Sequence, residues 1–149
     1  MLQDRFVPPA GAFTRSVAVR FSHCDPAGII YFPHYFDMFN GLIEDWYGEE
    51  LGHDYADLIM GSRFGFPFVH LDCDFKIPSR MGDVIEMTLL VEKVGRSSLG
   101  IAIVCHHDGF ERLRARMVTA MMSLETRQPV SLPDDLRAKI EAYKAKTEG

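Results

Sequence analysis

The feature that most constrains the fold of this chain is a run of aromatic and aliphatic residues at helical spacing between positions 33 and 52. Apolar side chains recur there every three or four positions, which is typical of one face of an α-helix. The stripe consists of Tyr35, Phe36, Phe39, Leu42, Ile43, Trp46 and Tyr47. Pro33 suits the first turn, where its missing N–H costs nothing, and Gly52 suits the end. A helix with this much aromatic surface must be wrapped by other structure.

Strands are expected on both sides of this helix, because apolar and polar residues alternate there. The expected strands, the last four in meander order, cover residues 16–22, 66–77, 83–94, 99–105 and 110–124. In the first of them Val17, Val19 and Phe21 share one face. Two further helices are expected, a short one at 54–60 and a polar C-terminal one at 133–146.

The order of these elements predicts an α+β domain in which an antiparallel sheet curls around the long helix. For a chain of 149 residues, one compact domain covering residues 1–149 is the expected organisation. The sequence contains no internal repeat, low-complexity tract or linker that would divide it.

Composition argues against several classes of function. The net charge of −5 disfavours general nucleic-acid binding, which needs an excess of basic side chains on one face. A phosphorylated small molecule remains compatible, because it needs only a local cluster of cations or N–H groups. Cys24, Cys73 and Cys105 are widely spaced and odd in number, so neither a disulfide framework nor a zinc site is predicted. Free thiols favour a cytoplasmic location, and no segment has the length of a membrane span.

The residues with most potential for chemistry lie between the first strand and the long helix. Asp25 stands there in an irregular turn that contains Pro26 and Gly28. The first N–H groups of a helix lack internal partners and carry a positive partial charge, so they can polarise a carbonyl oxygen. A nearby carboxylate can then attack the carbonyl carbon or activate water. The same pattern also fits an ordinary Asp turn or helix cap, and local sequence leaves both readings open.

The segment contains Asp25, Pro26, Ala27 and Gly28, followed by Tyr31, Pro33 and Tyr35 at the start of the expected helix. This pattern resembles the signature of the 4-hydroxybenzoyl-CoA thioesterase family of hot-dog fold proteins. In that family an Asp-x-x-Gly turn follows the first strand and leads through an aromatic-Pro-x-Tyr sequence into the central helix. The resemblance in general layout covers about residues 16–124.

The resemblance implies a hot-dog fold, a sheet wrapped around one helix, with subunits that pair their sheets edge to edge as dimers or tetramers. It implies that Asp25 acts as nucleophile or general base, and that the backbone N–H of Phe32 polarises the thioester carbonyl. It assigns a close approach of the ligand to Gly28, and contacts with CoA phosphates to Arg96, Ser97 and Ser98. Tyr31 and His34 in the same segment are further predicted substrate contacts, and so is Phe66, which belongs to an aromatic run after Gly61 that could line an acyl pocket. Phe66 serves equally well as core packing. No metal or other cofactor is implied.

Other residues offer alternatives to this assignment. Cys24 and His23 adjoin Asp25, but neighbouring side chains in extended backbone face opposite sides and are badly placed to share a proton. His23 can assist Asp25 or simply line the turn. Glu44, on the long helix, is a reserve catalytic acid. The row formed by Arg112, Arg114 and Arg116 reads as a solvated outer sheet face rather than a phosphate site.

The expected function is hydrolysis of an acyl-CoA thioester to free acid and CoA. The resemblance points to an aromatic acyl group such as 4-hydroxybenzoyl, or to a short or medium acyl chain. Two alternatives remain open, a hot-dog enoyl-thioester hydratase or dehydratase and a non-catalytic acyl-CoA binding protein.

Overall fold

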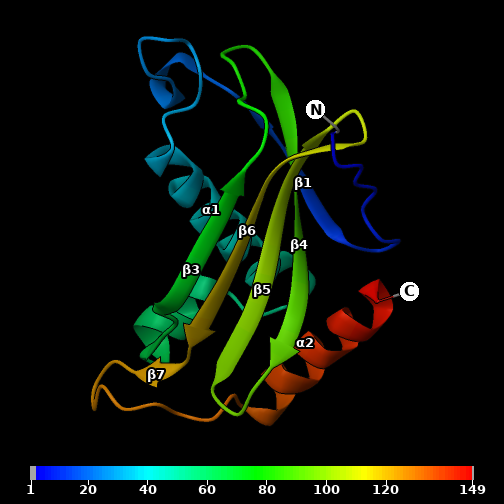
Figure 1. Cartoon of the computed structure of the whole chain (residues 1–149). Helices are drawn as coiled ribbons and strands as arrows, with labels where there is room; N and C mark the ends of the chain where they lie inside the picture. Colours follow the sequence, from blue (N-terminus) through cyan, green and yellow to red (C-terminus); the bar gives the residue numbers. More distant parts are fainter. Residues whose placement is uncertain (1–2, 149) are drawn as a thin grey trace.

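The computed structural model describes residues 3–148, in which a curved antiparallel sheet lies across one long helix (Figure 1). The helices are α1 (Pro33–Asp45), η2 (Trp46–Glu50), η3 (Asp57–Gly61) and α2 (Asp134–Thr147), with a short 3-10 turn η1 (Phe21–His23). The strands are β1 (Phe13–Ala18), β2 (Phe64–Gly65), β3 (Phe68–Phe75), β4 (Val84–Val94), β5 (Ser98–His107), β6 (Phe110–Ala120) and β7 (Met122–Ser123). Within the described part of the chain, no helix is long and apolar enough to cross a membrane.

The predicted aromatic helix forms the centre of the core. After Asp45 it widens into the π-type turn η2, in which the Leu51 N–H bonds to the Trp46 carbonyl at 3.1 Å. This widening turns Trp46, Tyr47 and Leu51 inward together, each with 2% exposure or less. Gly52 ends the helical segment with a φ of +72°, a conformation that glycine adopts without steric cost. The sheet residues buried in the same core are Ile85, Met87, Leu89, Val91, Leu99, Ile101, Ile103, Cys105, Leu113, Ala115 and Met117.

The sheet has the strand order β1-β4-β5-β6-β3, which corrects the expected meander. Strands β4, β5 and β6 do pair in sequence, but β3 pairs with β6 at the far edge instead of with β4. Residues 76–83 carry the chain back across the sheet, and the N–H of Lys76 donates to the Arg112 carbonyl at 2.9 Å on the way. An alternating pattern identifies a strand but not its partner, so the crossover could not be seen in the sequence.

The first and last predicted strands end earlier than expected. The first covers Phe13–Ala18 instead of 16–22, and Phe21 is 82% exposed in the turn η1 instead of lying on a strand face. Pairing beside β4 continues only to Val19, whose N–H bonds to the Asp83 carbonyl at 2.8 Å. The last strand breaks after Ala120, and β7 pairs with β2 in a separate two-stranded sheet.

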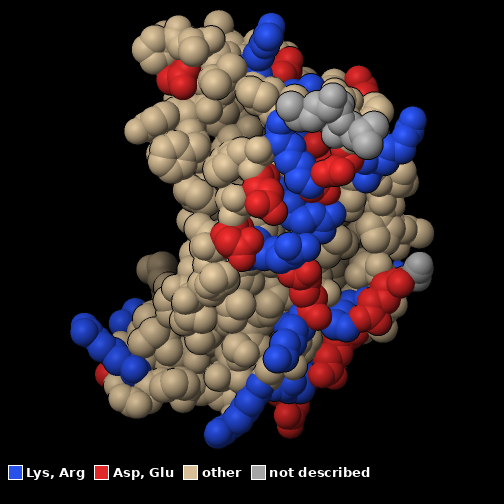
Figure 2. All heavy atoms as spheres, in the orientation of Figure 1, with Lys and Arg blue, Asp and Glu red and all other residues tan. Residues whose placement is uncertain are grey.

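The outer face of the sheet carries interleaved acidic and basic side chains (Figure 2). Of the expected solvated row, Arg116 is 50% exposed as predicted, but the side chains of Arg112 and Arg114 are only 16% and 23% exposed, and both are ion-paired. Arg114 and Lys76 converge on Glu111, which is 3% exposed. Burial alone would raise the pKa of Glu111, but the hydrogen bonds from Arg114 and Lys76 outweigh it and hold that pKa below its ordinary value.

The C-terminal helix α2 is fixed to the sheet through one buried phenol. Leu136 and Ile140 are fully buried on the face of α2 that packs against the core. Tyr143 on the same face donates its hydroxyl to the Leu89 carbonyl and accepts from the Phe13 N–H at 2.8 Å. This hydroxyl therefore joins α2 to β1 and β4 at once.

Tyr143→Phe should lower the free energy of unfolding by about 1–3 kcal/mol, because a buried N–H and a buried carbonyl both lose their partner. Urea denaturation followed by tryptophan fluorescence measures the change. Tyr31→Phe, at a phenol that is 49% exposed, is the matched control and should stay within about 0.5 kcal/mol of wild type. Equal effects of the two changes would contradict the anchoring role.

Glu111→Gln should destabilise the protein at neutral pH by about 1–3 kcal/mol, because Lys76 and Arg114 lose a shared buried carboxylate. Because the pKa of Glu111 is lower in the folded protein than in the unfolded chain, ionised Glu111 stabilises the fold fully above the unfolded-state pKa of about 4.3. This stabilisation is lost as the pH falls through the pKa of the folded state. The free energy of unfolding of the variant should therefore fall less steeply in acid than that of wild type. Glu92→Gln, at the exposed partner of Arg116, should leave both the stability and its pH dependence nearly unchanged.

Candidate active site

Asp25 lies in a tight turn whose shape is set by its own hydrogen bonds. Its Oδ1 accepts from the Ala27 N–H at 2.9 Å, and its carbonyl accepts from the Gly28 N–H at 2.9 Å. Gly28 has a φ of +78°, which a residue with a side chain adopts only with strain. The turn therefore holds the half-buried carboxylate by one oxygen and leaves the other without a hydrogen bond from the described residues.

The start of α1 supplies a backbone donor beside this turn. Tyr31 donates its N–H to the His23 carbonyl at 2.9 Å, and the Phe32 carbonyl accepts from Tyr35. The Phe32 N–H itself has no hydrogen-bond partner among residues 3–148. Phe32 directly precedes the first helical residue, Pro33. Its N–H is therefore a free donor at the positive end of the helix dipole.

Asp25 and Phe32 line the same cleft, which has a volume of about 440 Å³. The remaining lining residues are Ile29, Ile30, Tyr31, Tyr35, Phe75, Lys76, Ile77, Pro78 and Ser79. Its walls are therefore mostly aromatic and aliphatic, with one carboxylate and one helix-start donor among them. A cleft with this balance suits an apolar ligand that carries one reactive polar group.

A polar network that the sequence did not reveal continues from the cleft wall. Arg112 donates to the Ser79 hydroxyl at 3.1 Å and to the Asp83 carboxylate at 3.0 Å. Burial raises the pKa of Tyr35, an effect that the Ser79 hydroxyl partly offsets. The Arg80 N–H and then the Arg112 guanidinium hold the pKa of Asp83 below its ordinary value. The crossover of residues 76–83 brings Ser79 into the same cleft as Asp25, so no local sequence pattern predicts this network.

The neighbours of Asp25 in sequence contribute to the turn more than to the cleft. His23 accepts the Arg20 N–H at its Nδ1, so a neutral ring carries its proton on Nε2. The Cys24 thiol donates to the Arg20 carbonyl at 3.4 Å. His34 lies in the first turn of α1, with its ring centroid 6.2 Å from that of His23. None of the three side chains lines the cleft.

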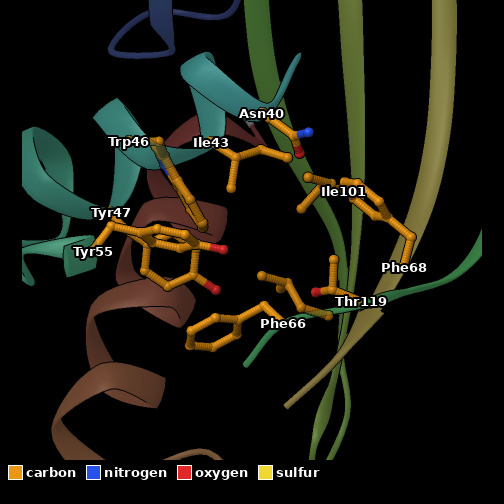
Figure 3. Close-up of a pocket in the computed structure, with 10 residues that line it drawn as sticks. Asn40, Ile43, Trp46, Tyr47, Tyr55, Phe66, Phe68, Ile101 and Thr119 are labelled. Carbon is orange, nitrogen blue, oxygen red and sulfur yellow. The ribbon is translucent and has the colours of Figure 1, made fainter. Parts of the chain in front are cut away.

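Phe66, a predicted substrate contact, does not line this cleft and lies beside a second cavity. Its ring packs 5.1 Å from Tyr47 and 5.6 Å from Tyr55, around this second cavity, whose close-up shows both phenols pointing inward (Figure 3). That cavity has a volume of about 20 Å³, enough for one water molecule and far too small for an acyl group. The indole Nε1 of Trp46, which also lines it, is buried without a partner among the described residues.

The predicted phosphate-binding turn Arg96–Ser98 is also remote from Asp25. It joins the end of β4 to β5, whereas the Asp25 turn contacts the loop before β4, at the opposite end of that strand. The Arg96 side chain donates to the Ser131 hydroxyl at 2.8 Å, and the Arg96 carbonyl accepts a hydrogen bond from Arg137 at 2.9 Å. The turn is thus docked on the segment that leads into α2. It reaches an active site only if that site belongs to another subunit.

The reserve acid Glu44 is not part of the cleft. It is exposed near the end of α1. Burial raises the pKa of Tyr55, and the charge of Glu44 raises that pKa further. Of the predicted site, one chain brings together Asp25, Phe32 and Tyr31, with Gly28 shaping the turn between them. Among residues 3–148, no group of three or more His, Cys, Asp or Glu side chains is arranged to hold a metal ion.

Comparisons with known proteins bear on the family and the fold. A 1,4-dihydroxy-2-naphthoyl-CoA hydrolase from Nostoc punctiforme is 27% identical, with 93% of each chain covered. A protein of the same name from Prochlorococcus marinus is 26% identical and covers 83% of this chain and 86% of its own. The solved structure of a thioesterase superfamily protein from Jannaschia sp. superposes with a TM-score of 0.82 at 26% identity, covering 95% of this chain and 97% of that one.

These likenesses confirm the predicted hot-dog fold and the resemblance to thioesterases. The 4-hydroxybenzoyl group stays a prediction, because these relatives are named for another acyl group. Residues 19–140, most of the chain, match the family described as the thioesterase-like superfamily. This chain belongs to the thioesterase-like superfamily.

Proposed function

We propose that this chain is an acyl-CoA thioesterase that hydrolyses an aromatic acyl-CoA to the free acid and CoA. The observation that carries the proposal is the shared cleft, which is lined both by Asp25, whose carboxylate is held in a turn, and by Phe32, whose helix-start N–H has no partner among the described residues. Relatives along nearly the whole chain are named as CoA-thioester hydrolases, which supports the same reaction.

The two groups act on different atoms of the thioester carbonyl, Asp25 at the carbon and the Phe32 N–H at the oxygen. As general base, Asp25 takes a proton from water while the water oxygen attacks the carbonyl carbon. The Phe32 N–H stabilises the oxyanion that forms, and the intermediate then expels the CoA thiolate, which is protonated to the thiol. As nucleophile, Asp25 would instead form a mixed anhydride that water then hydrolyses. Both routes need one free carboxylate oxygen, and the Ala27 bond leaves one.

An aromatic acyl group suits the walls of the cleft. Tyr31, Phe32, Tyr35 and Phe75 all line it. Phe32 meets Phe75 edge to face, with ring centroids 6.5 Å apart. A flat acyl ring gains offset or edge contacts with such walls beyond the burial of its area. The dihydroxynaphthoyl group in the relatives' names belongs to this class.

A second copy of this chain completes the site in our proposal. The edge strand β3 has an unpaired side and exposes apolar side chains, with Val69 at 61% and Leu71 at 40%. Its last residue Phe75, 55% exposed, lines the cleft itself. Pairing of two β3 edges in a cytoplasmic dimer or tetramer would cover this surface and enclose the acyl group.

Asp25→Asn should lower kcat by roughly 10²–10⁴-fold on an aromatic acyl-CoA, with thiol release followed by a colorimetric thiol reagent. The Asn side-chain oxygen still accepts the Ala27 N–H, so the turn and the melting temperature should be preserved. Cys24→Ser, beside it in the same turn, is the control and should retain nearly full turnover. Near-normal hydrolysis by Asp25→Asn would reject the assignment, and water addition to an enoyl-CoA without thiol release would favour a hydratase.

Replacing Val69 and Leu71 together by Lys should break the β3 interface, because like charges would face each other across it. Light scattering after gel filtration should then give a mass near 16.9 kDa instead of a multiple of it, and turnover should fall at least tenfold. Val7→Lys, at an apolar residue that is 80% exposed elsewhere, should change neither quantity. A monomeric wild type with full activity would rule out the shared site.

A further inference from the structure

A second groove continues directly from the catalytic cleft. Its volume is about 370 Å³, and it shares Ile29, Ile77 and Pro78 with the cleft. Beyond these three apolar residues its walls are polar, formed by Arg80, Asp83 and Arg112. A ligand that leaves the cleft across the shared apolar residues therefore reaches two guanidinium groups next.

The charge of this groove is positive. Arg112 is paired with Asp83 at 3.0 Å, but the exposed Arg80 side chain forms no ion pair within residues 3–148. Two guanidinium groups against one carboxylate leave an excess positive charge. The other cation nearby, Lys76 on the cleft wall, is already bound by Asp4 and Glu111. Arg80 is thus the cation that remains available to a ligand.

Backbone hydrogen bonds fix the position of Arg80 relative to the catalytic turn. The Ile30 N–H donates to the Ser79 carbonyl at 2.9 Å, and the Met81 N–H donates to the Gly28 carbonyl at 3.0 Å. The Arg80 N–H in turn donates to the Asp83 carboxylate at 2.9 Å. Arg80 is therefore held on a loop whose two flanking residues are bonded to the turn that carries Asp25.

We propose that this groove binds the phosphate groups of the CoA portion of the substrate through Arg80, with Arg112 beside it. The inference rests on the proposed hydrolysis and deepens it. The thioester end would lie at Asp25, the pantetheine arm would cross Ile29, Ile77 and Pro78, and the phosphates would meet the guanidinium groups. Arg binds phosphate through paired, charge-assisted hydrogen bonds, which fits a ligand anchored at its charged end.

This position differs from the phosphate site predicted from the resemblance. That site, at Arg96, lies at the other end of β4 and engages its Nε with Ser131. The two candidates are distinguishable because only Arg80 adjoins the cleft of its own chain. The comparison of Arg80→Gln with Arg96→Gln therefore tests one placement against the other.

The experiment uses one acyl group on two carriers, CoA and N-acetylcysteamine, which presents the same thioester without phosphates. Arg80→Gln should raise KM for the acyl-CoA by roughly 5–20-fold, the loss of one charge-assisted contact, with kcat little changed. On the N-acetylcysteamine thioester, kcat/KM of Arg80→Gln should stay within about twofold of wild type, and Arg96→Gln should resemble wild type on both. Arg80→Lys, which keeps the charge, should recover part of the acyl-CoA affinity.

An unchanged KM in Arg80→Gln, an equal loss on both thioesters, or a CoA-selective loss in Arg96→Gln would overturn the placement. Calorimetric binding of free CoA gives a second readout that does not depend on hydrolysis. There, Arg80→Gln should raise Kd by a similar factor and flatten its dependence on salt. If wild type releases no thiol but Arg80 still governs CoA binding, the proposed hydrolysis fails while the phosphate site stands.

Discussion

Burial of the aromatic face of α1 against the concave side of the sheet is the interaction on which the rest of this structure depends. Fully burying a single large apolar side chain contributes about 1.5–3 kcal/mol, and this helix buries several of them. The widened turn at Trp46 extends the buried face beyond the α-helical part, and α2 closes the core through Tyr143. Because the helix is fixed along its length, its first turn is fixed too, and the free N–H of Phe32 keeps a defined position.

The crossover of residues 76–83 forms one side of the proposed active site. By returning from the sheet edge to β4, it brings Ser79 and Arg80 into backbone contact with the turn that contains Asp25. One loop thereby forms a wall of the apolar cleft and a wall of the cationic groove. The proposed acyl, pantetheine and phosphate positions are consecutive along that single loop, so they depend on one set of backbone hydrogen bonds.

Sequence reasoning grouped the residues of the proposed reactive centre but did not predict their surroundings. Asp25, Phe32 and Tyr31 belong to one continuous segment, so local turn chemistry and the family signature were sufficient to group them. Arg96 was grouped with them by resemblance and Phe66 because of its aromatic neighbours, and neither lines the cleft of its own chain. The row of arginines on β6 was read as solvated because a strand pattern does not show which acids lie across from it. In the structure, Asp83 and Glu111 neutralise Arg112 and Arg114 respectively.

The sequence by itself determined the elements of this protein: a buried aromatic helix, alternating strands, and an Asp-containing turn between the first strand and the helix. These follow from hydrophobic periodicity and turn chemistry, which act between residues close together in the chain. The tertiary structure alone decided that β3 pairs with β6 and that the cleft runs on into a groove with Arg80 at its end. The reason is that strand pairing and the shape of a cavity depend on contacts between distant residues, and these leave no periodic trace in the sequence.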